Sequence, residues 1–406
     1  MRIAKRTPQT ALFHLSLFVL ACSACILMQN EVRRGGTSYI VAVAFMLWAV
    51  FALKPLENGY KLEKPSTTLF LFNIYFIWVI FVTTVMPDTH LLETAPGKYF
   101  MLIFGAALPF LIANTVYYFI LHRGNDKHFL DNIAVMVAML LLIYSHSYSL
   151  AMAVSEDAHL SGSYYSLFLL PLIMMNRRKT VKYIGLILIC IALFSSVKRG
   201  GILALFLAII AYLLFSQWAK TNKSTAAKLT SAILVSAIFI ALFVYLASMG
   251  NNNIMERFEN TENDSGSGRT FVWEETWRLI NAQGITNYMI GNGFNAVVNN
   301  SRYALSAHND YLEAWYDFGL VGLVLYSLSV LSMLTANIKA IIAKKPYAPA
   351  FSMFSSIYMV LSLVSHIGIY YWMTLAAINI GYFIGLIDYD KKHASVETEG
   401  GRHVEA

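Results

Sequence analysis

Long runs of apolar residues, separated by short polar segments, limit how this chain can fold more than any other feature of its sequence. We count about twelve such runs, and most approach the roughly 20 residues that a helix needs to cross the hydrocarbon core of a bilayer. Only 13% of the residues are charged, whereas a soluble domain has about 25%. The sequence therefore predicts an all-α integral membrane protein with about twelve transmembrane helices.

The predicted helices and polar segments divide the chain into four parts. Residues 1–249 contain transmembrane helices 1–9, residues 250–311 form the one long loop, residues 312–387 contain transmembrane helices 10–12, and residues 388–406 form a polar tail that we expect to be disordered. The apolar runs cover residues 9–28, 38–53, 67–86, 99–121, 132–152, 162–176, 183–197, 201–217, 229–249, 312–336, 349–367 and 370–387.

The distribution of lysine and arginine predicts an orientation for these helices. If the N-terminus is cytoplasmic, 21 of the 30 basic residues fall in cytoplasmic segments, as the positive-inside rule expects. Both termini are then cytoplasmic, and the loop 250–311 faces the opposite side. The exceptions on that opposite side are Arg33, Arg34, Lys98, Lys198, Arg199, Arg257, Arg269, Arg278 and Arg302.

The long loop is expected to contain local structure. After a Gly/Ser-rich stretch, the segment RTFVWEETWRLINAQG places Trp273, Trp277 and Ile280 at helical spacing, and Gly284 is a suitable stop. The later segment 291–293, Gly-Asn-Gly, is too short to indicate a nucleotide site, so we interpret it as a turn.

Lys198 and Arg199 stand between two apolar runs, followed at once by two glycines. The preceding run, 183–197, has about fifteen residues and spans roughly 22 Å, less than the ~30 Å hydrocarbon core. Arg199 is therefore expected at the outer headgroup level. Two interpretations remain open: the pair reaches toward lipid headgroups, or it meets a bound phosphate or diphosphate.

Arg269 begins the predicted loop helix, and Arg278 lies nine residues further on. A guanidinium group offers a planar fork of donors that matches phosphate oxygens two at a time. A diphosphate site would use two such forks. The alternative is that either arginine is an ordinary surface residue.

His308 lies near the end of the loop 250–311, shortly before an apolar run. Histidine is the usual side chain for proton transfer near neutral pH, although an isolated histidine is more often a satisfied interfacial residue. Asp310 and Glu313 are nearby carboxylates. Because Asp310 falls in the first turn of the expected helix, where the dipole favours a carboxylate, we interpret it as a helix cap rather than a catalytic group.

Several classes of chemistry lack their usual sequence signals. The chain has no zinc-ligand cluster, P-loop or serine-nucleophile motif, so we expect no metal and no cofactor. Cys22, Cys25 and Cys190 all lie inside apolar runs and are interpreted as small core residues. The net charge of +7 fits cytoplasmic anchoring, and we expect no nucleic-acid partner.

Three short segments together resemble the O-antigen ligase/polymerase superfamily. The first is H-N-x-Y-L followed by two glycines, here His308, Asn309, Tyr311, Gly319 and Gly322. SSVKRGG resembles the family's S-x-R-G turn and places its arginine at Arg199; SGRTFVW resembles the S-R-x-x-x-W segment and places the second arginine at Arg269. Lys198 and the additional Arg278 depart from the simplest pattern.

The resemblance implies a GT-C-like glycosyltransferase of the Gram-negative inner membrane, with its active site facing the periplasm. O-antigen ligases fit best within the superfamily, because they share the cytoplasmic termini, the number of spans and the length of the loop. The implied donor is a polysaccharide on undecaprenyl diphosphate, the implied acceptor is the lipid A core oligosaccharide, and membrane lipids surround both. Arg199 and Arg269, with Lys198 and Arg278, would hold the diphosphate, and His308 would be the base of a metal- and ATP-independent, inverting transfer.

Two alternatives stay open at this point. An O-antigen polymerase uses the same donor with a second lipid-linked chain as acceptor. A transporter or flippase for a polar lipid predicts broken helices and buried charges near the bilayer midplane. The apolar runs of this chain contain almost no charge, and its exceptional basic residues lie at their outer ends, which favours chemistry at the outer surface.

Overall fold

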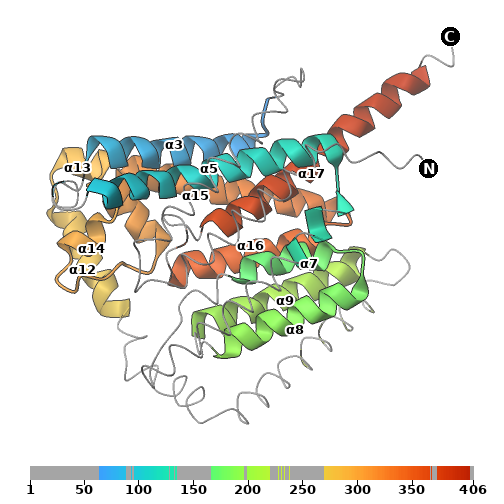
Figure 1. The fold of residues 1–406 in the computed structure, drawn as a ribbon, viewed down its shortest axis with the longest axis horizontal. Coiled ribbons are helices and arrows are strands. Elements are labelled where there is room, and N and C mark those ends of the chain that lie inside the picture. Colours follow the sequence, from blue (N-terminus) through green and yellow to red (C-terminus); the bar gives the residue numbers. More distant parts are fainter. Residues whose placement is uncertain are drawn as a thin grey trace. The chain divides into compact units, whose positions relative to one another are not determined.

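The computed structural model describes residues 64–87, 96–127, 129–131, 166–195, 199–219, 269–365 and 373–402, with a few single positions between these ranges. Every regular element of this described part is a helix, and no strand occurs in it, which confirms the all-α prediction there (Figure 1). The apolar runs at 9–28, 38–53 and 229–249, and most of 132–152, lie outside the described residues, as does Lys198.

The described helices follow the predicted apolar runs closely. Three of them are long and apolar enough to cross a membrane, namely Thr67–Val85, Gly200–Ala219 and Asp310–Ile342. In chain order the helices are α3 (Thr67–Val85), α5 (Pro96–Arg123), α7 (Leu170–Met175), α8 (Lys179–Ser195), α9 (Arg199–Ala219), α12 (Arg269–Ala282), α13 (Ile285–Ile290), α14 (Ala296–Asn300), α15 (Asp310–Ile342), α16 (Ala348–Val364) and α17 (Met373–Arg402).

Large apolar side chains cover the outer surfaces of the long helices. On α3, Ile77, Phe81 and Val85 are each about half exposed and follow one another at intervals of four residues. Leu331 of α15 and Leu203 of α9 are similarly exposed. A helix surrounded by water would turn such a stripe toward a core, so these faces indicate contact with lipid.

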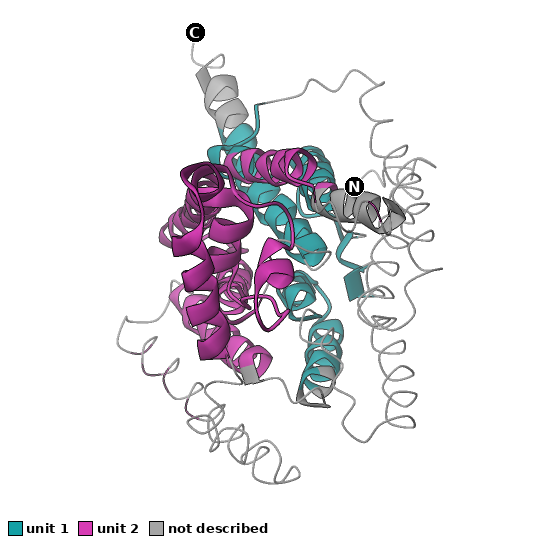
Figure 2. Ribbon diagram, turned by 90° about the vertical axis from the view of Figure 1, so that its left-hand side faces the viewer, with its two compact units in different colours: residues 1–70, 108–196, 371–406 teal, residues 71–107, 197–370 magenta. Residues whose placement is uncertain are grey.

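The chain forms two compact units (Figure 2). Unit 1 comprises residues 1–70, 108–196 and 371–406, and unit 2 comprises residues 71–107 and 197–370. The residues that carry the resemblance, from Arg199 at the start of α9 to the first turns of α15, belong to unit 2.

In unit 1, α17 packs closely against α5. Gly381 and Gly385 lie one turn apart on α17, and a Cβ on Gly385 would lie 2.9 Å from the Cβ of Ile120. Small residues at this spacing let two helices approach closely in a membrane. The Tyr117 hydroxyl of α5 donates to Asp388 across the same contact, at 2.9 Å.

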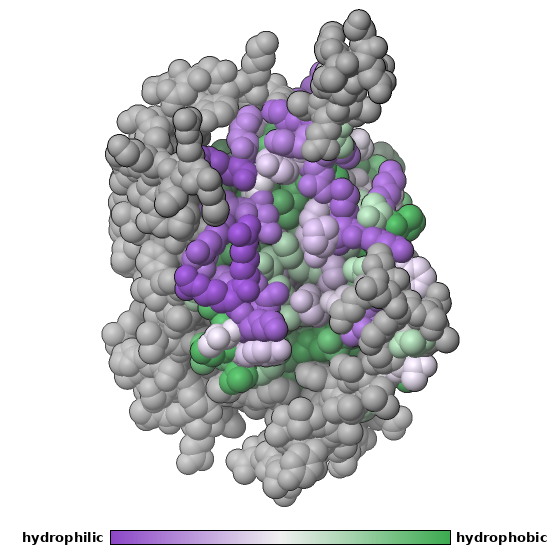
Figure 3. All heavy atoms as spheres, turned by 90° about the vertical axis from the view of Figure 1, so that its right-hand side faces the viewer, coloured by the Kyte–Doolittle hydropathy of each residue, from purple (hydrophilic) through white to green (hydrophobic). Residues whose placement is uncertain are grey.

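The basic residues that end α5 and extend α17 lie at the same end of unit 1. Arg123 ends α5, and the Tyr382 hydroxyl of α17 donates to Asn125 just beyond it, at 3.0 Å. Lys391 lies two turns further along α17. Figure 3 views the molecule from the right-hand side of Figure 1, where α17 ends, and shows hydrophilic side chains gathered on this face.

The expected disorder after residue 388 is wrong, because α17 continues to Arg402. Side-chain pairs along the helix support the polar extension. Lys391 forms an ion pair with Asp388 at 2.7 Å, and the rings of Tyr389 and His393 lie 4.0 Å apart. Such contacts between residues three or four apart stabilise an exposed helix.

In unit 2, α16 packs along α9 and also contacts α15. The rings of Tyr75 on α3 and Tyr326 on α15 lie 5.2 Å apart in the core of this unit. Trp78, one turn along α3, donates its indole N–H to the backbone carbonyl of Phe318 at 2.9 Å. That carbonyl is available because the helical pattern of α15 is interrupted at the next residue.

Gly319 breaks α15 into two parts. Its φ of 71° and ψ of −178° are not helical, and a Cβ at this position would collide with the carbonyl of Met289 on α13. Only glycine adopts this backbone conformation readily. The predicted membrane helix therefore consists of a short segment, 310–318, followed by a long apolar segment, 320–342.

Candidate active site

Three residues singled out by the sequence lie at or beside the N-terminal ends of helices. Arg199 is the first residue of α9, Arg269 is the first residue of α12, and His308 lies two residues before α15 begins. Helix N-termini carry partial positive charge from unpaired backbone N–H groups, and they attract anions. The starts of α9 and α12, which carry no acidic residue in their first turns, therefore share an electrostatic character that suits a phosphate group.

The turn that carries His308 is held in an unusual conformation. His308 has a φ of 50°, in the left-handed region that few non-glycine residues occupy. The next residue, Asn309, caps α15: its side-chain oxygen accepts from the backbone N–H groups of Tyr311, at 3.0 Å, and Leu312, at 3.2 Å. The cap fixes where α15 begins and so fixes the position of His308.

A hydrogen bond from α12 reaches the same turn. Trp273 lies one helical turn after Arg269, and its indole N–H donates to the carbonyl of Ala307 at 2.8 Å. Ala307 immediately precedes His308, and Arg269 itself is partly buried. The contact brings the first turn of α12 to the His308 turn.

The end of α16 connects the His308 turn with the start of α9. The side-chain amide of Asn309 donates to the carbonyl of Leu363 at 3.4 Å. Val364, the next residue, lies against Gly200, where a Cβ would be only 2.9 Å from its Cγ2 atom. The backbone of Arg199, directly before Gly200, is thereby placed at the end of unit 2 that holds His308 and Arg269.

Three buried carboxylates on the first part of α15 organise the segments around it. Asp310, Glu313 and Asp317 occupy one face of the helix at i, i+3 and i+7, and each is at most 2% exposed. Each accepts hydrogen bonds from backbone N–H groups outside α15. The carboxylate oxygens therefore serve as acceptors for backbone N–H groups of irregular segments, which have no helical partner.

Asp310 and Glu313 hold the two segments nearest to the candidate site. Asp310 accepts from the backbone N–H of Ile367 at 2.8 Å and from the Tyr326 hydroxyl at 2.7 Å. Our interpretation of Asp310 as the helix cap is wrong, because Asn309 fills that role and Asp310 ties α15 to the segment after α16. Glu313 accepts from the backbone N–H of His308 at 3.3 Å.

Asp317 organises the turn at the end of α13. It accepts from the backbone N–H groups of Asn295, at 3.0 Å, and Val297, at 2.9 Å, where α14 begins. The backbone N–H of Gly293 donates to the Asp317 carbonyl at 2.9 Å. This confirms that residues 291–293 form a turn, and it explains why the turn lies directly against the break at Gly319.

The predicted loop helix is confirmed as α12, which ends at Ala282, two residues before Gly284. Together with α14 and α15 it surrounds a small apolar core that includes Ile280, Val297 and Tyr316. The rings of Trp277 and Trp315 pack edge to face at 5.4 Å on the same side. The described part of the loop is thus folded onto the first part of α15.

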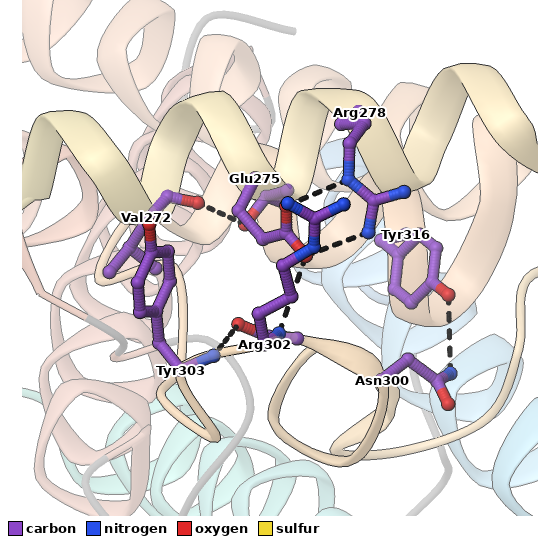
Figure 4. A network of polar contacts seen from close by, with 9 residues as sticks. Val272, Glu275, Arg278, Asn300, Arg302, Tyr303 and Tyr316 are labelled. Carbon is purple, nitrogen blue, oxygen red and sulfur yellow. Dashed lines mark hydrogen bonds and ion pairs between the residues drawn. The ribbon is translucent and has the colours of Figure 1, made fainter.

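The two arginines of α12 differ in their surroundings. Both oxygens of Glu275 accept from the guanidinium of Arg278, at 2.7 and 2.8 Å (Figure 4). The same carboxylate accepts from the backbone N–H of Arg302 at 3.3 Å. The hydrogen bonds from Arg278 lower the pKa of Glu275 to about 2. The fork of Arg278 is therefore engaged by a carboxylate of its own helix, and Glu275 in turn joins α12 to the segment that leads to His308.

The remaining motif residues lie at the contacts that fix α15. The ring of Tyr311 packs edge to face on Tyr326 at 5.2 Å. Gly319 forms the break, and Gly322 lies against Trp78, whose indole nitrogen would be 3.4 Å from a Cβ there. These residues shape the helix that carries the His308 turn.

Sequence reasoning missed three side chains that organise this end of unit 2: Trp273, Glu275 and Asp317. The spacing of Asp310, Glu313 and Asp317 along one helical face is a signal that could have identified a functional face on α15. In the sequence, Trp273 stands out as part of a helical pattern and as the tryptophan of the S-R-x-x-x-W resemblance, with no role assigned to it. No local pattern indicates that its indole reaches a residue 34 positions away.

Comparison with known families finds one family model that matches part of the chain. Residues 184–327 match the family model described as O-antigen ligase. The matched segment begins within α8 and ends within α15, so it contains Arg199, Arg269 and His308. A comparison with curated proteins finds no match to this chain. Residues 184–327 are therefore similar to the O-antigen ligase family, whose members are glycosyltransferase-like enzymes.

Proposed function

We propose that this protein is an O-antigen ligase, which transfers O-antigen polysaccharide from undecaprenyl diphosphate to the lipid A core oligosaccharide. The reaction takes place at the periplasmic face of the inner membrane of a Gram-negative bacterium. Both termini are cytoplasmic, and the loop 250–311 is periplasmic. The family match and the apolar faces of the long helices support the proposal.

The observation that carries the proposal is the convergence of three helix starts at one end of unit 2. Trp273 connects the first turn of α12 to the His308 turn, and Asn309 connects that turn to the end of α16, beside which α9 begins. A lipid diphosphate has the charge that helix N-termini and arginine side chains favour. In the proposed complex, His308 would accept the proton of the acceptor hydroxyl.

The transfer is a single displacement. Arg199 and Arg269 hold the donor diphosphate and stabilise the negative charge that grows on it. His308 accepts the proton from an acceptor sugar hydroxyl while that oxygen forms a bond to the anomeric carbon. The bond between the anomeric carbon and the phosphate oxygen breaks, and its electron pair leaves with undecaprenyl diphosphate. No covalent enzyme intermediate forms, so the anomeric configuration is inverted.

Arg269 is the better candidate for the loop arginine at the diphosphate. The two oxygens of Glu275 occupy the guanidinium fork of Arg278 within α12, and the same carboxylate accepts from the backbone N–H of Arg302. Arg269 instead starts α12, one turn from the tryptophan that contacts the His308 turn. We assign Arg278 a structural role, and Lys198 a supporting one beside Arg199.

A transfer assay with purified lipid-linked donor tests these roles. Removing a group that stabilises transition-state charge typically lowers the rate by about 10²–10³. We expect Arg199→Ala, Arg269→Ala and His308→Ala each to abolish detectable transfer at normal protein levels. Wild-type protein should form the new glycosidic bond without ATP and in the presence of a chelator, whereas a transporter would form none. If a variant transfers sugar at the wild-type rate, the residue that it replaces does not have the proposed role.

The lipopolysaccharide profile of a deletion strain distinguishes a ligase from a polymerase. Loss of a ligase leaves bare lipid A core, with full-length polymer retained on the lipid carrier. Loss of a polymerase leaves cores capped by a single repeat unit. We expect the bare-core pattern, and we expect a plasmid carrying His308→Ala to leave it unchanged while the wild-type gene restores long chains.

A further inference from the structure

One peptide group next to the candidate base is held from both sides. The carbonyl of Ala307 and the N–H of His308 belong to the same peptide unit. The carbonyl accepts from the Trp273 indole at 2.8 Å, and the N–H donates to the Glu313 carboxylate at 3.3 Å. The orientation of this peptide plane is thereby fixed by two side chains.

The two side chains come from different helices and are themselves well anchored. Trp273 lies on α12, in the turn that follows Arg269. Glu313 lies on α15, is only 2% exposed and also accepts from the side chain of Ser306. The peptide before His308 is therefore one of the points at which the loop helix and α15 are joined.

The conformation of His308 explains why such a joint is needed. A φ of 50° places its Cβ close to its own backbone carbonyl region, so a non-glycine residue relaxes to negative φ unless surrounding contacts prevent it. A change of φ at His308 would rotate its peptide plane away from Trp273 or Glu313, or swing the imidazole to a new direction. Holding the peptide thus holds the direction of the imidazole.

We propose that Trp273 and Glu313 are positioning residues, which clamp the Ala307–His308 peptide so that the imidazole points at the acceptor hydroxyl. The catalytic part of this proposal rests on the proposed function of His308. The conformational part does not, because it concerns only the backbone at His308. Because the clamp involves both α12 and α15, the direction of the His308 imidazole also depends on how α12 packs on α15.

Kinetics of a matched pair of tryptophan variants test the catalytic part. Trp273→Phe keeps an aromatic ring but removes the indole donor. Because small displacements of a catalytic group can cost about 10²-fold in rate, we expect kcat to fall by about 10- to 100-fold while KM for the donor stays within about twofold. Trp277→Phe, one turn further on α12 and half exposed, should stay within about twofold of wild type in both constants. A wild-type kcat for Trp273→Phe would overturn the proposal.

Two substitutions of Glu313 separate hydrogen bonding from simple packing. In Glu313→Gln, the side-chain amide oxygen can still accept from the His308 N–H, whereas the leucine side chain of Glu313→Leu cannot. We therefore expect Glu313→Gln to retain most of kcat and Glu313→Leu to lose it, again with little change in KM for the donor. Equal losses in both variants would show that the carboxylate acts in some other way.

A stability measurement tests the clamp without using activity. Glycine adopts positive φ without strain, so His308→Gly removes the need for the clamp. We expect Trp273→Phe to lower the thermal unfolding temperature more in the His308→Gly background than in wild type, because loss of the clamp lets His308 relax and recover the strain of its positive φ, whereas glycine has no strain to recover. Equal shifts in both backgrounds would overturn the clamp. The effects of Trp273→Phe and His308→Gly on the unfolding temperature could depend on each other while His308→Ala remains active. This result would support the clamp and reject His308 as the base.

Discussion

The two parts of α15, on either side of Gly319, use the same helical geometry for different purposes. In the first part, residues 310–318, three buried carboxylates accept hydrogen bonds from backbone N–H groups of other segments. In the second part, residues 320–342, the buried Ser329 donates to the carbonyl of Leu325 in its own helix. The first part thus holds neighbouring segments of the chain by hydrogen bonds, and the second part is suited to apolar surroundings.

The difference follows from where each part finds its hydrogen-bond partners. A helix in lipid must satisfy its backbone polar groups internally, and Ser329 and Thr335 of the second part likewise donate to carbonyls of their own helix. The turns near 295, 308 and 367 have backbone N–H groups without helical partners, and the first part of α15 supplies the acceptors. The break at Gly319 lets one continuous chain segment contain both kinds of helix.

The largest effect on stability is expected for Gly319→Ala, which changes the residue that separates the two parts of α15. Alanine would require a positive φ of 71° and would collide with the Met289 carbonyl. Strain and overpacking together should cost on the order of 3 kcal/mol or more. Thermal unfolding in detergent measures the loss. Gly284→Ala is the control, since nothing lies within 4 Å of a Cβ there. An equal loss of stability in both variants would contradict the requirement for glycine at the break in α15.

The next largest effect is expected for Asp317→Ala in the first part. The substitution leaves the buried N–H groups of Asn295 and Val297 without their acceptor, at a cost of about 1–3 kcal/mol for each group. The matched change in the second part, Ser329→Ala, removes a hydroxyl bonded within its own helix and should cost less than about 1 kcal/mol. Similar losses of unfolding free energy in the two variants would contradict the division of roles.

A smaller effect, mainly on stability, is expected for Arg278→Gln. The substitution removes the bidentate partner of Glu275, so the loop should become less stable toward heat. The transfer rate should remain within about threefold of wild type, in contrast to the complete loss expected for Arg269→Gln. A transfer rate lowered as far as that of Arg269→Gln would show that Arg278 also contacts the donor.

The smallest effect concerns the pH dependence of stability in Glu275→Gln. The pKa of Glu275 is lowered from 4.5 to about 2 in the folded protein, so its charged form stabilises the fold above about pH 4.5. This contribution is lost as the pH falls toward 2. The unfolding temperature of wild type should therefore exceed that of the variant most at about pH 6, and the gap should narrow as the pH falls to about 3. A gap that is independent of pH would rule out this ion pair as a stabilising contact.

Local features of the fold were predictable from sequence because they depend on neighbouring residues. The apolar run around 201–217 and the helical spacing of Trp273 and Trp277 predict α9 and α12 directly. The prediction fails for the polar residues after Asp388, because pairs such as Tyr389 and His393 support a helix that composition alone does not suggest.

The assembly of the candidate site depends on contacts between distant residues, and no short sequence pattern specifies them. The H-N-x-Y-L segment identified His308, yet the φ of 50° at that residue and the bond from Trp273 to Ala307 appear only in three dimensions. Gly319 belongs to the resemblance, but its role as a break in α15 follows from its contact with Met289. Sequence thus supplied the candidate residues, and the structure supplied their connections.

Donor binding and transfer, measured in the same sample of the His308→Ala variant, test the central proposal most directly. If Arg199 and Arg269 hold the diphosphate and His308 moves the proton, the variant should bind lipid-linked donor as tightly as wild type and form no product. Arg269→Ala should lose both binding and product. Transfer at the wild-type rate by His308→Ala would contradict the assignment of the base and, with it, the account of this site.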